Sequence, residues 1–286
     1  MRRVTADEVA SALAEIGVGE GDVLHVQSDL LRIGPVDAPM TRDGLCGFHL
    51  DALRAAVGSS GTVTCCTAFE DYGRWNTTYV REDSPSRTDT LSEYIRTRPG
   101  AVRSMHPIVS VTGLGARAEE LCGGPHYDGF GYESPWGRLH RADAWICSYG
   151  LGPLHGGTTF NHFVERMYGV PYQYTKMYSG TVMSGGREVP GPFTMSVRYL
   201  DFRISNVPTK VKPMLLEAGA ARMARLGRGV VWACRARAYL DLTFEHLHGD
   251  RWFLLEEPPA FRPGEIPTDG PTGEMRMVYD HQEAIA

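Results

Sequence analysis

Segments of helical and strand character alternate through the first half of the chain. Thr5 and Glu8 are spaced as in a capping box, and Val9, Leu13 and Ile16 repeat at helical spacing, which predicts a first helix that ends near Gly17. Further helices are predicted near residues 45–57, 90–97 and 116–122, and strands near residues 22–27, 62–67, 108–112 and 144–149. This order is typical of a partly parallel sheet covered by helices on both faces.

The second half changes in character. A helix is expected to begin near Thr159, and residues 176–205 read as strands broken by glycine and proline, which indicates hairpins. A helix over residues 213–226 and a strand over residues 230–238 complete the pattern, whereas residues 69–89 show no period and are predicted to form a long loop. We therefore expect one α/β domain spanning residues 1–286. It would be a three-layer α/β/α sandwich around a mixed, partly parallel sheet, with a β-hairpin-rich excursion in the C-terminal half.

Composition narrows the class of partner. The formal charge of -5 and the absence of a Lys/Arg cluster argue against a nucleic-acid partner and suit a small cationic molecule. No apolar run approaches the roughly 18 to 20 residues of a membrane span, and the N-terminus lacks the apolar core of a signal peptide. The six cysteines form no CxxC pair. We expect a soluble, cytoplasmic protein with reduced thiols and no membrane partner.

The densest group of reactive residues follows a glycine-rich loop at residues 156–157. On a helix beginning near Thr159, His162 and Glu165 lie three residues apart on one face. An imidazole can accept the proton that an amine loses as it attacks a thioester carbonyl, and a carboxylate can orient the ring or stabilise its cation. Thr158 and Thr159 could cap the helix or place a hydroxyl near the developing oxyanion. The alternative is a capped helix whose histidine and glutamate merely lie at the surface.

Three shorter segments could bind phosphate. Arg103 and Ser104 precede His106-Pro107 at the start of a predicted strand, where a guanidinium could hold a phosphate group. The turns that begin at Ser28 and Ser134 could offer backbone N–H groups. Taken alone, each segment favours an ordinary surface turn over a phosphate site. The chain contains neither a GxGxxG fingerprint nor a Walker loop.

Taken in order, these segments resemble the aminoglycoside 3-N-acetyltransferase family over about residues 6–240. The resemblance is carried by residues 21–34, Gly61 to Thr64, Arg103-Ser-Met-His-Pro107 with Ser110, Ser134-Pro-Trp-Gly-Arg-Leu139, the Thr159-x-x-His162-x-x-Glu165 pattern and Val170-Pro-Tyr172. It implies direct transfer from acetyl-CoA to an amine in a ternary complex, on a layered α/β/α fold, with no metal.

The resemblance also assigns roles. His162 would be the general base, Glu165 its partner and Thr159 a helper near the thioester, with His106 a second candidate for catalysis. The coenzyme segments of the family correspond to Ser28, Asp29, Leu30, Arg103, Ser104, Ser110, Ser134 and Pro135. The acceptor would be a small cationic amine such as an aminoglycoside, and Glu70 and Asp71 in the predicted long loop could attract it. A homodimer is the default assembly.

Two departures leave other functions open. Asp29 replaces a serine that the family usually carries near the pyrophosphate, and Cys65-Cys66 replaces a segment that commonly contains proline. A biosynthetic N-acyltransferase with another amine or acyl donor is the main alternative. A cysteine hydrolase, a non-catalytic binding protein and a zinc protein are the others. The zinc ligands would be His155, His162 and Glu165, or His246 and His248.

Overall fold

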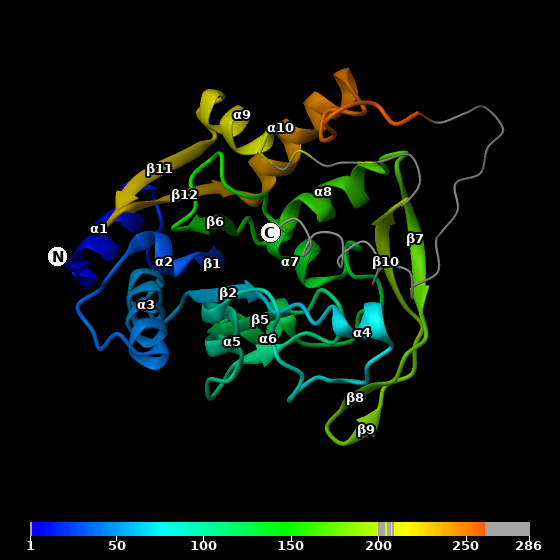
Figure 1. Cartoon of the computed structure of the whole chain (residues 1–286), viewed down its shortest axis with the longest axis horizontal. Helices are drawn as coiled ribbons and strands as arrows, with labels where there is room; N and C mark the ends of the chain where they lie inside the picture. The colour runs from blue at the N-terminus through cyan, green and yellow to red at the C-terminus, as the bar shows by residue number, and fades with distance from the viewer. Residues whose placement is uncertain (1, 200–203, 205–206, 208, 261–286) are drawn as a thin grey trace, which may run out of the picture.

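The computed structural model describes residues 2–199, 204, 207 and 209–260 (Figure 1). Within this range, seven strands form the main sheet in the order β11-β12-β6-β1-β2-β5-β4. Their bounds are β1 Val23–Ser28, β2 Thr62–Cys66, β4 Val102–Arg103, β5 Val111–Gly115, β6 Trp145–Tyr149, β11 Ala221–Leu226 and β12 Gly229–Arg235. β1 runs parallel to β2 and β6, and the other neighbouring strands pair antiparallel. The sheet is therefore mixed and partly parallel, as predicted.

Helices cover both faces of this sheet because its central strands are apolar on both sides. In β6, Ile146 faces one apolar core while its neighbours Trp145 and Cys147 face the other, which is the period of two expected for a strand. One core is closed by α1 (Ala6–Glu15), α2 (Leu30–Ile33), α3 (Arg42–Val57) and α5 (Thr90–Arg96). The other is closed by α6 (Ala118–Cys122), α7 (Pro135–Arg141), α8 (Phe160–Tyr168), α9 (Val211–Glu217) and α10 (Ala236–Gly249). The predicted three-layer arrangement is confirmed.

The predicted hairpin-rich excursion is also present. β7 (Gln173–Tyr178) pairs antiparallel with β10 (Phe193–Arg198), and between them lie β8 (Val182–Ser184) and β9 (Arg187–Glu188). Figure 1 shows the β7–β10 ribbon beyond α8, at the end of the molecule opposite α1. Residues 200–203 and 205 of the predicted hairpin region lie outside the described residues.

The segment predicted as a long loop carries regular structure. It contains the short helix α4 (Asp71–Trp75) and the strand β3 (Tyr79–Val80). β3 pairs in parallel with β8, a partner about a hundred residues further along the chain. Backbone hydrogen bonds to such a distant strand leave no period in the local sequence, which explains why the segment resembles a loop.

The helix predicted over residues 213–226 is wrong in its second half. Only α9 is helical there, and the chain turns at Gly219, whose φ of 70° is readily adopted by glycine. Residues 221–226 then form the edge strand β11 against β12. The next predicted strand ends early, at Arg235, because α10 begins at Ala236. No helix in the described part of the chain is long and apolar enough to cross a membrane.

Candidate active site

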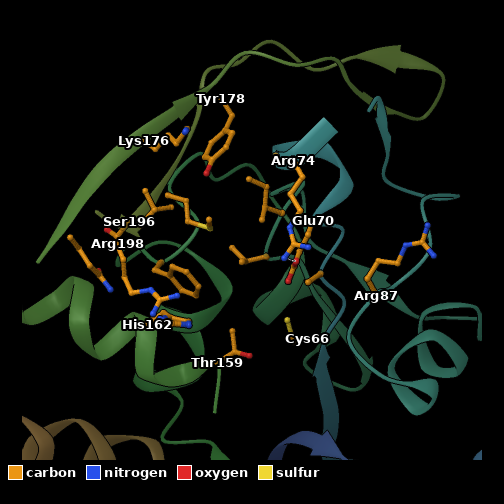
Figure 2. Close-up of a pocket in the computed structure, with 18 of the residues that line it drawn as sticks. Cys66, Glu70, Arg74, Arg87, Thr159, His162, Lys176, Tyr178, Ser196 and Arg198 are labelled. Carbon is orange, nitrogen blue, oxygen red and sulfur yellow. Dashed lines mark ion pairs between the residues drawn. The ribbon is translucent and has the colours of Figure 1, made fainter. Parts of the chain in front are cut away.

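A cavity of about 480 Å³ opens where β2 ends and α8 begins. Cys66, the last residue of β2, lies at its floor beside Thr159 and His162 from the start of α8. Residues 68–88, which include α4, form one wall, and the β7–β10 ribbon forms the opposite wall. Figure 2 shows the floor residues between the two walls. The excursion thus encloses a space at the end of β2, beside the start of α8.

His162 and Glu165 form a hydrogen-bonded pair in this cavity. The His162 Nδ1 lies 2.8 Å from Glu165 Oε2, and the imidazole is 43% exposed whereas the carboxylate is fully buried. Glu165 also accepts hydrogen bonds from the Tyr172 hydroxyl at 2.9 Å and from Gln173 Nε2 at 2.9 Å. Because an ionised carboxylate only accepts, Nδ1 is the donor and Nε2 is left as the basic nitrogen. Glu165 is fully buried and is held by two further side chains. The alternative that this histidine and glutamate merely lie at the surface of a capped helix is therefore not supported.

The Cys66 thiol on the cavity floor lies beside the hydroxyls of Thr159 and of Thr88, the latter from one wall. Burial raises the pKa of the Cys66 thiol to about 11, although hydrogen bonds with Thr88 and Thr159 act in the opposite direction. Cys65 is buried as well, and burial raises its pKa well above the ordinary value. A neutral thiol is a poor nucleophile, so this environment does not favour a cysteine hydrolase. Thr159 makes no capping hydrogen bond in α8, and Thr158 instead donates to the Tyr239 hydroxyl.

The two predicted acceptor-binding acids face arginines. Glu70 lines the cavity and forms an ion pair with Arg74, one helical turn further along. Asp71 forms an ion pair with Arg87 at 2.9 Å. Both arginines line the cavity, and of the two acids only Glu70 does. The negative charge that was expected to attract a polyamine is therefore balanced within this wall.

Arg103 and its neighbouring serines lie inside the protein. The Arg103 guanidinium donates to the carbonyl oxygens of Thr67 and Ser84 and to the Ser110 hydroxyl. The Ser104 hydroxyl accepts from the backbone N–H of Val111. None of Arg103, Ser104 and Ser110 lines the cavity. The hydrogen bonds of Arg103 connect residues 81–88, which are part of one cavity wall, to the main sheet.

His106 has a comparable internal position. Its Nε2 lies 3.0 Å from the carbonyl oxygen of Thr194 in β10, and its Nδ1 accepts from the N–H groups of Ile108 and Val109. Burial lowers its pKa to about 4, so the ring is neutral at physiological pH. His106 does not line the cavity, whereas Ile108 and Val109 do. Its hydrogen bonds join the β7–β10 ribbon to the turn at residues 106–109, and the ring does not face the cavity.

The other predicted coenzyme residues cap helices or fill the core. Asp29 caps α2, accepting from the Arg32 backbone N–H, and forms an ion pair with the Arg32 side chain at 2.9 Å. Ser28 and Leu30 on either side of it are buried. Ser134 caps α7, of which Pro135 is the first residue. None of these five lines the cavity.

Sequence reasoning missed the wall formed by the β7–β10 ribbon. Tyr174, Lys176 and Tyr178 come from β7, and Ser196 and Arg198 from β10. Alternating aromatic and charged residues in a predicted hairpin were the available signal, but nothing local shows that the hairpin lies against α8. As for metals, the described residues include no group of three or more histidines, cysteines or acids that could hold an ion.

Comparison with known proteins gives a consistent result. Residues 26–248 match the family model described as aminoglycoside 3-N-acetyltransferase. The chain is 31% identical over 206 residues to aminoglycoside N(3)-acetyltransferase VIII of Streptomyces fradiae, covering 65% of this chain and 69% of that protein. It is 30% identical to aminoglycoside N(3)-acetyltransferase VII of Streptomyces paromomycinus, covering 65% and 68%.

Solved structures share the fold. Aminoglycoside acetyltransferase AAC(3)-IIb superposes with a TM-score of 0.75 at 20% identity, covering 87% of this chain and 98% of that chain. The binary complex of AAC-IIIb with CoASH superposes with a TM-score of 0.74 at 23% identity, covering 90% and 100%.

Proposed function

Since the chain belongs to the aminoglycoside 3-N-acetyltransferase family and is an acetyl-CoA-dependent N-acetyltransferase, we propose that His162 is the general base that activates the acceptor amine. The observation that carries this proposal is the hydrogen bond between His162 and the buried Glu165 inside the cavity. That bond fixes the ring and leaves Nε2 as the nitrogen that takes the proton.

His162, Glu165 and Thr159 then each have a chemical task. Acetyl-CoA supplies the thioester carbonyl that the amine attacks. His162 takes the amine proton as the C–N bond forms and can return it to the departing thiolate as the C–S bond breaks. Glu165 stabilises the imidazolium that exists between these two transfers. The Thr159 hydroxyl and the N-terminal end of α8, which lie beside His162 in the cavity, would stabilise negative charge on the carbonyl oxygen.

The chemistry of the lining residues fits an acyl-CoA. Ala68, Ile108 and Val109 offer an apolar surface suited to the pantetheine arm, and Arg87 offers an exposed cation suited to phosphate. The coenzyme role of Ser28, Asp29, Leu30, Arg103, Ser104, Ser110, Ser134 and Pro135 remains a proposal that rests on the family resemblance. Arg103 gives this proposal the least support, because its guanidinium donates to buried carbonyl oxygens.

Two classes of acceptor follow from different observations. The names of the relatives make an aminoglycoside amine the first acceptor to assay, and Glu70 would contact it. An amine outside the aminoglycosides, as in a biosynthetic N-acyltransferase, is favoured by the ion pairs of Glu70 with Arg74 and of Asp71 with Arg87, because they leave neither acid free to attract a polycation.

The proposal is tested by incubating the purified protein with acetyl-CoA and a panel of aminoglycosides and simpler primary amines. Thiol release is followed with a chromogenic disulfide, and the products are weighed by mass spectrometry. We expect thiol release only when an amine is present, together with a product that is heavier by one acetyl group. Equal release without any amine would instead indicate hydrolysis and would overturn the proposal.

A further inference from the structure

A fully buried lysine lies behind the loop that leads into α8. Lys212 is the second residue of α9, and its side chain is closed to solvent. Its Nζ donates a hydrogen bond to the carbonyl oxygen of His155 at 3.1 Å and lies 5.7 Å from the centroid of the Trp232 ring. Within the described part of the chain, the ionisable group that acts on it is the Cys147 thiol, and no carboxylate does so.

Such a lysine opposes folding. Moving an ammonium ion out of water is unfavourable unless an anion balances it, and a carbonyl oxygen with the face of an indole replaces its hydration only in part. Burial accordingly lowers the pKa of Lys212 to about 8. The other buried residues of α9, Val211 and Leu215, are apolar, so an apolar side chain of similar length would serve the packing of this helix equally well. Residues that oppose folding in this way are typical of functional sites.

The carbonyl group that Lys212 holds belongs to the loop between β6 and α8. At the start of the loop, Gly150 donates a backbone hydrogen bond to β12, and near its end the Thr158 hydroxyl donates to α10. Residues 154–156 between these two anchors are exposed. Among the hydrogen bonds that the described structure gives residues 151–157, the bond from Lys212 alone comes from another element. The buried lysine therefore holds the middle of an otherwise exposed loop from the inside.

The path of this loop decides where α8 begins. Thr159 is the N-cap of α8 and makes no capping hydrogen bond, so the loop rather than a cap fixes that end of the helix. Gly156 is not restrained by packing, since a Cβ atom built there would meet nothing within 4 Å. Thr159 and His162 both line the cavity. Because a misplacement of about 1 Å can slow a reaction by about 100-fold, a loop released at His155 would impair these two groups.

We propose that Lys212 is a positioning residue for acetyl transfer: its hydrogen bond to His155 holds the β6–α8 loop in the path that places Thr159 and His162 on the cavity floor. This inference rests on the proposed function, because it takes the reaction to occur at His162. Lys212 itself does not touch a reactant, since it is fully buried and does not line the cavity. Its substitution should therefore alter kcat and the mobility of the loop, and leave the affinity for acetyl-CoA unchanged.

The test compares the wild type with Lys212→Met, which removes the ammonium group and keeps an unbranched side chain. Lys212→Gln, whose side chain is one atom shorter than that of lysine, is the second variant should the first not fold. Leu215→Ala is the matched control, because it loosens the packing of the same helix and leaves the bond to His155 in place. Turnover is measured with an amine that the wild type acetylates, the Kd of acetyl-CoA by calorimetry, and stability by urea titration. Hydrogen exchange of peptides covering residues 150–160 is followed by mass spectrometry.

In Lys212→Met we expect a kcat about 10- to 100-fold below wild type, a Kd of acetyl-CoA within about twofold, and faster exchange confined to residues 150–160. The urea midpoint should be equal to that of the wild type or higher, because a buried charge without an anion has been removed. Leu215→Ala should lower the midpoint and keep kcat within about twofold. A loss of activity without a loss of stability distinguishes positioning from a merely structural role.

Several outcomes would overturn the inference. A folded variant at Lys212 with the wild-type kcat would do so, as would unchanged exchange over residues 150–160. An equal fall in kcat in Leu215→Ala would assign the effect to the packing of α9. If the wild type releases no thiol with any amine, the proposed function itself fails. Faster exchange in Lys212→Met would then still support the anchoring of the loop, and unchanged exchange would overturn that as well.

Discussion

Replacing the buried carboxylate of the dyad should slow catalysis without removing the base. In Glu165→Gln the new amide oxygen can still accept from His162 and Gln173, while the amide nitrogen meets the Tyr172 hydroxyl, which can act as an acceptor. The shape of the site and the ring orientation are therefore retained. What is lost is the negative charge that stabilises the imidazolium.

The size of that loss follows from the contact distance and from the surroundings. The two groups are 2.8 Å apart between Nδ1 and Oε2, so their charge centres lie about 4 Å apart. Attraction at that separation is about 1 kcal/mol in water and about 4 kcal/mol at the effective dielectric constant of a protein site. For a fully buried carboxylate beside a half-exposed ring, the attraction energy lies between these limits, at about 2 to 3 kcal/mol. The expected decrease in kcat is about 30- to 150-fold.

The assay is steady-state turnover at saturating acetyl-CoA and amine near neutral pH, with calorimetry for the Kd of acetyl-CoA. Tyr172→Phe is the matched control, because it removes a donor to Glu165 but keeps the charge, and its kcat should fall by less than about tenfold. A folded Glu165→Gln protein with kcat within about twofold of wild type would refute the reasoning. So would a loss that appears in KM alone.

Three further predictions concern groups that sequence reasoning placed elsewhere or overlooked. Arg103→Ala should lower the free energy of unfolding by about 3 to 5 kcal/mol in urea titrations, because it leaves buried carbonyl oxygens without a donor; unchanged stability with weakened acetyl-CoA binding would favour a coenzyme contact instead. Alkylation of Cys66 by iodoacetamide near pH 8 should be about 100-fold slower than that of an unfolded-state cysteine and should accelerate toward pH 11, since burial raises its pKa to about 11; peptide mass spectrometry measures both rates, and fast alkylation of the folded protein would disprove this. Burial lowers the pKa of His126 to about 3, so below about pH 6.5 the unfolded chain binds the proton first and stability falls as the pH decreases, by about 2 kcal/mol at pH 5; His126→Phe should make the dependence of unfolding free energy on pH shallower over this range, and an identical slope would contradict it.

Features encoded within a few residues were predicted well. The capping box of Thr5 and Glu8 forms as expected, and the apolar runs that predicted the central strands are β1, β2 and β6. The spacing of His162 and Glu165 placed both on one face of a helix, and the family resemblance made them partners; the structure shows the hydrogen bond between them. These predictions depend on local periodicity and capping, which are properties of short segments.

Features that depend on distant partners were not predictable. β3 exists because β8 pairs with it, and β11 is a strand because β12 offers it an edge. Arg103 shows the same limit for a side chain. In the sequence, an arginine that precedes a strand is compatible with phosphate binding. Only the structure shows that its partners are buried carbonyl oxygens of other segments.

The central claim is that His162 removes the acceptor proton during acetyl transfer. Its most direct test is the turnover of His162→Ala with an amine that the wild type acetylates, at saturating acetyl-CoA and neutral pH. The expected result is a kcat about 10² to 10⁴-fold below wild type, with the Kd of acetyl-CoA and the circular dichroism spectrum unchanged. A folded variant that binds acetyl-CoA normally and acetylates the amine at the wild-type rate would contradict the account.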